Sequence, residues 1–336
     1  MPSDAESPAS SEPGAKRSLI PPWLSLGLRL LCSGILVWFL VSRLDTANMA
    51  RFLRQAHLPL VALTLMTVLM DRAFMVSRWI LLLEALGFAT SRGRVIRIFF
   101  LSTFFGSFLP SGIGGEAVRA ISFSRLTSRS AESVASVIMD RFLGLLSMLL
   151  TGLLALGSFY QLSPDPALLV AVVVLLGLAI LGLGMLLSVR WNERIVRLIS
   201  SIASRRVSWL NRLVGALGRY RHQSRALIVV LGLSVGVQLL RVTQAYLLSE
   251  AMSLGVRFEY FLCFIPIILV VTMLPISVGG WGTTNAAYWA LFVPVGMDPD
   301  GAFVLSVLIL ALGVFGNLPG GLIYAWEGFD ASDASR

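Results

Sequence analysis

The sequence predicts an all-α polytopic membrane protein with six full transmembrane helices plus two oppositely oriented re-entrant hairpins in an inverted repeat. Of its 336 residues, 56% are hydrophobic and only 13% are charged, a composition that excludes an ordinary soluble domain. Apolar runs of roughly 20 residues, the length that crosses a bilayer, recur along the chain. The motif Leu-Pro-x-x-(Ile/Val)-Gly-Gly begins at Leu109 and begins again 165 residues later, at Leu274.

Six apolar runs are long enough to cross the membrane, and they cover residues 24–41, 58–83, 134–159, 167–189, 226–248 and 302–326. Residues 1–22, which are rich in Pro, Ser, Ala and Glu, predict a disordered cytoplasmic tail. The first run lacks a small-residue cleavage signal, so we expect a retained helix rather than a signal peptide. Residues 23–327 are therefore predicted to form a single membrane domain, followed by a cytoplasmic tail, 328–336.

Two further apolar segments are interrupted by Pro and Gly, the residues that most disfavour a continuous helix. We predict a first hairpin from 96–109 and the stretch after Gly115, and a second from 260–274 and 276–294. Arginines flank the first hairpin on both sides, whereas Asp298 and Asp300 follow the second. By the positive-inside rule, the first hairpin enters from the cytoplasm and the second from outside.

An arginine-rich segment lies between the two halves of the chain. Residues 190–225 contain nine arginines, with apolar residues recurring between them at helical spacing. This pattern predicts an amphipathic helix that lies on the anionic inner leaflet. The resulting topology places both termini in the cytoplasm.

The 165-residue offset extends the repeat beyond the two motifs. It maps residues 58–83 onto 223–248 and 134–159 onto 299–324, both of which coincide with apolar runs. We expect repeat one at about 24–160 and repeat two at about 166–326, with the arginine-rich insertion displacing the counterpart of the first span. Each half contains an odd number of spans, so the two halves enter the membrane in opposite senses.

Eight ionisable residues fall within apolar segments: Asp71, Arg72, Arg78, Glu116, Arg119, Asp140, Arg141 and Arg241. Because a charge at a helix centre costs roughly 2.5–3.5 kcal/mol, most of them should be paired, hydrated or near an interface. Even complete pairing leaves a positive excess, which predicts a polar cavity suited to an anion. Two alternatives stay open: Arg72 and Arg78 as interfacial anchors, and Asp140–Arg141 as an internal structural pair.

The glycine pairs of the two motifs suggest a second way to bind an anion. Gly114–Gly115 and Gly279–Gly280 would expose successive backbone N–H groups, and a helix that starts there points its positive end at the cavity. Phosphate is the natural guest. Close helix packing or a simple turn is the alternative explanation for these glycines.

Several function classes find no support in the sequence. It contains none of the motifs of metalloproteases, serine hydrolases or P-loop ATPases, and no metal-spaced His/Cys cluster. We therefore expect no enzymatic activity, no cofactor and no metal. The net charge of +9 comes mainly from arginines between or inside apolar runs, so membrane topology explains it better than nucleic-acid binding does.

Four stretches carry a family resemblance: FGSFLPSGIGGEAVR at 105–119, DRFLG at 140–144, RWILLL at 78–83 and LPISVGGWG at 274–282. Together they resemble the flippase-like transmembrane domain, best known as the membrane half of bacterial lysylphosphatidylglycerol synthases. The resemblance covers residues 24–325 without a counterpart of the aminoacyl-transferase domain, so synthase activity does not carry over. The matching motifs imply functional roles for Pro110, Gly114, Gly115, Glu116, Arg119, Asp140, Arg141, Pro275, Gly279 and Gly280.

The resemblance implies movement of a polar lipid between leaflets, and the charged residues fit this function. We expect a flippase or scramblase of a bacterial inner membrane for an anionic phospholipid or a polyprenyl-phosphate-linked lipid, with Arg119, Arg141 and Arg241 neutralising the headgroup. Glu116 or Asp140 would couple movement to a proton or would hold the arginines. The alternatives are export of a soluble anionic small molecule and a non-catalytic role beside a separate lipid-modifying enzyme.

Overall fold

The computed structural model describes residues 54, 56–107, 114–159, 177, 181, 207–272 and 280–327. Every regular element in these ranges is a helix, as predicted. The main helices are α3 (Leu58–Ala85), α4 (Arg92–Gly106), α5 (Gly114–Thr127), α6 (Ser130–Phe159), α9 (Val207–Arg219), α10 (Ser224–Ala251), α11 (Phe258–Thr272), α12 (Thr283–Phe292) and α13 (Pro299–Glu327). The predicted span 24–41 and nearly all of 167–189 lie outside the described residues.

Four helices are long and apolar enough to cross a membrane: α3, α6, α10 and α13. Large apolar side chains are exposed on their outer faces, with Met66 at 67%, Ile228 at 70% and Leu322 at 71% exposure. Such an apolar exterior over long helices is typical of contact with lipid rather than water. The chain is a multi-pass membrane protein.

Shorter helices form the two broken pairs, α4 with α5 and α11 with α12. The start of α12 differs from the prediction, because the helix begins at Thr283 and not at 276. Gly280 and Gly282 precede it with φ angles of 83° and 86°, a conformation that glycine adopts without steric cost. These two glycines therefore form a turn where a continuation of the helix was expected.

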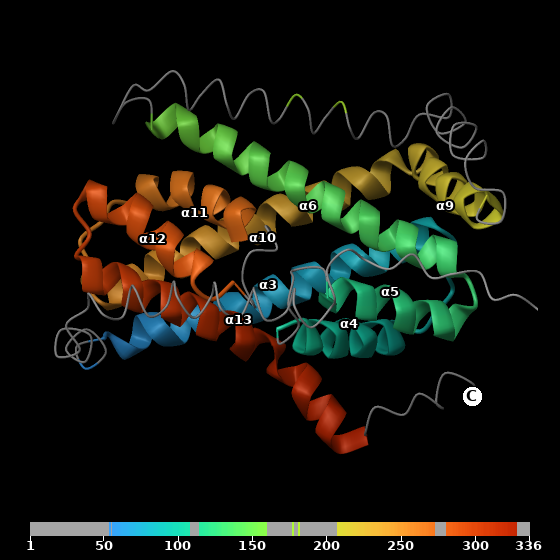
Figure 1. Cartoon of the computed structure of the whole chain (residues 1–336), viewed down its shortest axis with the longest axis horizontal. Coiled ribbons are helices and arrows are strands. Elements are labelled where there is room, and N and C mark those ends of the chain that lie inside the picture. The colour runs from blue at the N-terminus through green and yellow to red at the C-terminus, as the bar shows by residue number, and fades with distance from the viewer. Residues whose placement is uncertain are drawn as a thin grey trace, which may run out of the picture.

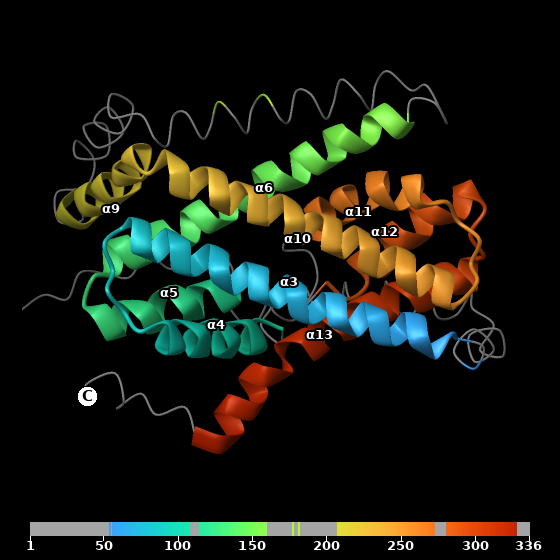
Figure 2. The same cartoon turned by 180° about the vertical axis from the view of Figure 1, so that it is seen from behind.

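The two pairs enter the bundle from opposite ends, and their inner ends approach its middle (Figure 1; Figure 2). Between them, α3 and α10 run side by side in opposite directions, with the His57 backbone N–H donating to the Ala251 carbonyl at 2.9 Å. The opposed entry of the pairs agrees with the direction that the loop charges predict.

Helix contacts occur in matched sets across the two halves. Helix α4 of the first half packs on α13 of the second, and α11 of the second packs on α6 of the first. Likewise α5 packs on α6, and α12 packs on α13. Under the 165-residue offset, α4 corresponds to α11, α5 to α12 and α6 to α13. The contact of α4 with α13 therefore corresponds to that of α11 with α6, and the contact of α5 with α6 to that of α12 with α13. This correspondence supports the internal repeat proposed from the sequence.

Two hydrophobic cores hold the ends of the bundle together. The first unites α3 to α6 with α9 around Trp79, Phe99 and Phe123, and the second unites α10 to α13 around Phe261 and Phe292. Aromatic side chains bury more apolar surface than any others, so these clusters dominate the packing energy. The polar residues of the middle are left between the two cores.

Helix α9 lies differently from the prediction. We expected its apolar face to rest on lipid, but Leu213 and Leu217 are buried in the first core, and α9 packs against α6. The Tyr220 hydroxyl that follows it donates to the Leu82 carbonyl of α3 at 3.0 Å. Apolar side chains of α3 and α6 therefore cover much of this apolar face.

The glycines at the inner end of the first pair permit a close approach of α4 and α5. A Cβ atom on Gly115 would lie 2.7 Å from the Ser102 carbonyl oxygen and 3.0 Å from the Gly106 Cα. No side chain fits at such distances, so this position requires glycine. Close packing, one of the alternatives left open, accounts for Gly115.

Candidate functional site

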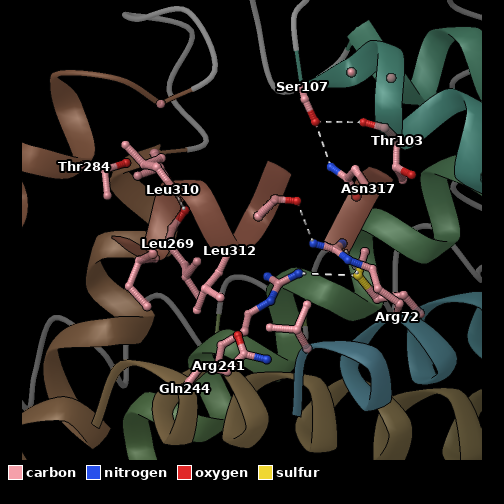
Figure 3. A pocket seen from close by; sticks show the side chains of 18 of the residues that line it. Arg72, Thr103, Ser107, Arg241, Gln244, Leu269, Thr284, Leu310, Leu312 and Asn317 are labelled. Atoms are coloured by element: carbon pink, nitrogen blue, oxygen red, sulfur yellow. Dashed lines mark hydrogen bonds between the residues drawn. The ribbon is translucent and has the colours of Figure 1, made fainter. Parts of the chain in front are cut away.

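A cavity of about 420 Å³ lies where the two pairs approach each other, with lining residues from α3, α4, α5, α10, α11, α12 and α13. Its apolar wall comes mainly from α11 and α13 (Figure 3). Polar side chains line the remainder: Arg72, Ser102, Thr103, Ser107, Glu116, Arg119, Arg241, Gln244, Thr272, Thr284, Tyr288 and Asn317. Its volume falls within the range of roughly 300–1,000 Å³ that small-molecule sites occupy.

A first cationic group, Asp71, Arg72 and Arg241, joins α3 to α10. The two carboxylate oxygens of Asp71 lie 3.8 Å from Arg72 Nη1 and 3.4 Å from Arg241 Nε. Both guanidinium groups also approach the Met75 sulfur, at 3.4 and 3.5 Å, and Figure 3 shows the two arginine side chains beside each other. One carboxylate thus faces two arginines that line the cavity.

A second cationic group, Arg78, Arg119 and Asp140, joins α3, α5 and α6. Arg78 Nη2 donates to Asp140 Oδ1 at 2.7 Å and to the Asp140 carbonyl at 2.9 Å. Arg119 Nη1 lies 3.5 Å from Asp140 Oδ2. The Arg119 guanidinium carbon lies 5.2 and 5.4 Å from the ring centroids of Trp79 and Phe99, distances at which cation–π attraction stabilises a desolvated arginine.

A separate ion pair lies beside the second group. Arg141 Nε donates to both carboxylate oxygens of Glu116, at 2.6 and 2.5 Å. Glu116 lines the cavity, whereas Arg141 lies behind it. The pair holds one acidic side chain in the cavity wall. Because it has no net charge, it does not change the positive charge of the second cationic group.

The first pair is also tied to α13. Asn317 Nδ2 donates to the Ser107 hydroxyl at 2.7 Å, and that hydroxyl donates to the Thr103 carbonyl at 3.1 Å (Figure 3). Asn317 Oδ1 is buried and has no hydrogen-bond partner among the described residues. This leaves one unused hydrogen-bond acceptor beside the cavity.

The second pair contributes uncharged groups to the same cavity. Gly280, Thr284 and Tyr288 line it, and behind them Asn285 Nδ2 donates to the Ser306 hydroxyl at 2.6 Å. None of the described cavity residues of α11 and α12 is ionised. As the two motifs predict, the charges of the hairpins belong to the first, where Glu116 and Arg119 follow the glycines.

Of the residues predicted to form the site, Gly115, Glu116, Arg119, Arg241 and Gly280 line the cavity. Asp140 and Arg141 lie behind this wall and hold Arg119 and Glu116 in place. Gly114 begins α5 but is not part of the lining. Pro110, Pro275 and Gly279 lie outside the described residues.

The alternatives left open by the sequence are now decided. Arg78 is only 5% exposed and bonds to Asp140, and Arg72 lines the cavity, so neither is an interfacial anchor. Asp140 and Arg141 do not form a pair with each other, because they bond to partners on different helices.

Sequence reasoning missed the uncharged polar residues of the cavity, and two of them, Gln244 and Asn317, carry amide side chains. Gln244 lies one helical turn after Arg241, so the periodicity of α10 would have placed both on one face. Asn317 is an amide within an apolar span, a signal that such a side chain faces other helices rather than lipid.

A comparison with protein-family models matches the chain to a known family. The model of the lysylphosphatidylglycerol synthase TM region matches residues 26–320, nearly the whole chain and all but the last residues of α13. No curated protein matches the chain significantly.

Proposed function

The chain belongs to the lysylphosphatidylglycerol synthase TM region family, and we propose that it is a lipid flippase or scramblase. In this proposal it moves an anionic phospholipid or a lipid-linked polar headgroup between the leaflets of the bacterial inner membrane, without catalysing a chemical reaction. The family itself supports a role connected with membrane lipids. The observation that carries the transport proposal is a cavity with a positive excess, placed between two helix pairs that enter from opposite ends.

The proposed path takes the headgroup through the cavity while the acyl chains stay in the surrounding bilayer. Arg72, Arg119 and Arg241 would bind the anionic headgroup, because arginine donates to phosphate oxygens in a bidentate manner. The apolar exterior of α3, α10 and α13 supports an environment in which lipid tails remain outside. Serines, threonines and amides of the cavity wall would replace water around the headgroup.

The acidic residues have a positioning role in this proposal. Asp140 contacts Arg78 and Arg119, and Glu116 contacts Arg141. An arginine alone in the membrane would be costly, so a nearby carboxylate stabilises it until a phosphate arrives. This arrangement favours holding of the arginines over proton coupling.

Leaflet exchange in reconstituted vesicles tests the proposal. We expect the purified full chain to accelerate dithionite quenching of fluorescent phosphatidylglycerol placed in the inner leaflet. Arg119→Gln should slow exchange about tenfold or more, since a hydrogen bond to a charged group contributes roughly 1.5–3 kcal/mol.

Arg257→Gln is the matched control for this experiment. It removes the same charge from an exposed pair with Glu259, at 2.9 Å. Neither residue lines the cavity, so this variant should exchange lipid at the wild-type rate. If the wild type exchanges neither phosphatidylglycerol nor a polyprenyl-phosphate lipid, the proposal is wrong. Uptake of a soluble organic anion instead would identify an exporter, and co-purification of an inert protein with a transferase would identify a partner protein.

The proposed orientation has its own test. Basic residues gather at the end of the bundle that holds α9, where Arg219 bonds to Glu132 at 3.2 Å, and Arg257 lies at the other end. In a variant with Cys32 and Cys263 replaced by alanine, Ala89→Cys should react with an impermeant maleimide only from the cytoplasmic face. Arg257→Cys should react only from the periplasmic face. Labelling of both from one face would contradict the orientation.

A further inference from the structure

The cavity carries a positive excess in two separate places. In the first cationic group, Asp71 faces Arg72 and Arg241. In the second, Asp140 faces Arg78 and Arg119. Each group therefore has one positive charge that no described carboxylate balances, since Glu116 is matched by Arg141.

The sequence between the helices of each pair adds no charge. Residues 108–113, between α4 and α5, and residues 273–279, between α11 and α12, contain no ionisable side chain. An acid that neutralises either group cannot come from these two connections.

The two surpluses arise at different places along α3. Asp71 and Arg78 are seven residues apart on α3, which separates their backbones by about 10 Å along the helix axis. Their partners extend the separation to different helices, because Arg241 belongs to α10 and Arg119 to α5. A ligand that balances both groups needs two anionic positions.

Both groups also contain buried donors that await an acceptor. Among the described residues, Arg72 Nε and Arg119 Nε have no hydrogen-bond partner, although Arg119 is only 4% exposed. The described acceptors of Arg72 are weak, a thioether sulfur and a carbonyl oxygen, each at 3.4 Å. Buried N–H groups are nearly always satisfied in proteins, and phosphate oxygens would satisfy these.

We propose that the preferred ligand is a lipid whose headgroup contains two phosphates, one bound by each cationic group. The inference rests on the proposed function, because it takes the ligand to be a membrane lipid. The two phosphates could be joined through a short linker, as in cardiolipin, or directly, as in a polyprenyl diphosphate, with the long arginine side chains reaching towards it from both groups. A lipid with one phosphate leaves one of the groups unbalanced and one buried arginine without an acceptor.

Binding to the purified full chain tests the inference independently of transport. The unfolding temperature in detergent would be measured with phosphatidylglycerol, phosphatidic acid, cardiolipin and a polyprenyl diphosphate. We expect the two-phosphate lipids to half-saturate the shift at concentrations about tenfold or more below the one-phosphate lipids. Phosphatidic acid separates the number of phosphates from total charge, because its single phosphate monoester carries more than one negative charge at pH 7.

Variants of the two groups sharpen this test. Arg72→Gln and Arg119→Gln each remove one surplus charge, so each should abolish the preference for two phosphates while binding of phosphatidylglycerol persists. Arg119→Lys keeps the charge and should keep most of the preference, which guards against a variant that merely misfolds. Arg257→Gln should match the wild type.

Two outcomes would overturn the inference. The first is that phosphatidylglycerol or phosphatidic acid half-saturates the wild type at the same concentration as cardiolipin and the diphosphate. The second is that Arg72→Gln and Arg119→Gln each weaken the binding of all four lipids by the same factor. If the protein prefers two-phosphate lipids in binding but does not exchange lipid between leaflets, the transport proposal is wrong and this inference stands. If it exchanges lipid but shows no preference for two phosphates, this inference is wrong and the transport proposal stands.

Discussion

Asp140→Asn is expected to lower the free energy of unfolding by about 3–5 kcal/mol, the cost of removing one partner from a buried ion pair. The carboxylate bonds to Arg78 at 2.7 Å and lies 3.5 Å from Arg119. Its loss leaves two arginines, 5% and 4% exposed, without a counter-charge. Thermal and denaturant unfolding in detergent, followed by tryptophan fluorescence, would measure the change, because Trp79 lies beside Arg119.

Two comparisons give this prediction its specificity. Glu84→Gln removes the same charge from an exposed pair with Arg92 and should change stability by no more than about 0.5 kcal/mol. Adding Arg78→Gln to Asp140→Asn should restore part of the loss, because one unpaired charge disappears. Wild-type stability of Asp140→Asn would show that the second cationic group does not exist as described.

Gly320→Ala should be the most damaging single methyl addition to α13. Its Cβ would overlap the carbonyl of Phe100 and lie 2.8 Å from the Phe104 Cβ. Both neighbours belong to α4, so the helix would have to move away from α13. Overpacking of this kind costs about 1–3 kcal/mol, and the displacement would also strain the hydrogen bond between Asn317 and Ser107.

The unfolding temperature and the leaflet exchange rate of Gly320→Ala should both fall. Gly232→Ala is the control, because nothing lies within 4 Å of a Cβ at that position of α10, and alanine in place of a helical glycine stabilises by roughly 0.5–1 kcal/mol. Equal behaviour of the two variants would contradict the close approach of α4 and α13.

The broken helix pairs illustrate what could be predicted from one sequence. Proline and glycine interrupt the backbone wherever they occur, so the motifs at Leu109 and Leu274 announce breaks without any tertiary information. The arginines and aspartates of the flanking loops then predict opposed directions, and the bundle has them. The predicted start of α12 was wrong. The run of apolar residues continues through Gly280 and Gly282, but the positive φ angles of these two glycines are incompatible with a helix.

The ion pairs illustrate what could not be predicted. Arg78 bonds to Asp140 from a position 62 residues away, and Arg241 lies against Asp71 from another helix. The neighbouring residues Asp140 and Arg141 looked like partners, yet successive side chains on a helix point in directions about 100° apart. Only the packing of α3, α5 and α6 determines which carboxylate meets which arginine.

By itself, the sequence determined the membrane class, the repeat with its 165-residue offset, the two breaks and the excess of buried arginine, because hydropathy, backbone restriction and charge are local properties. The tertiary structure alone decided how that excess is divided, that α9 covers the first core and that Arg72, Gln244 and Asn317 enter the cavity. These outcomes depend on which helix faces meet, and long-range packing sets them.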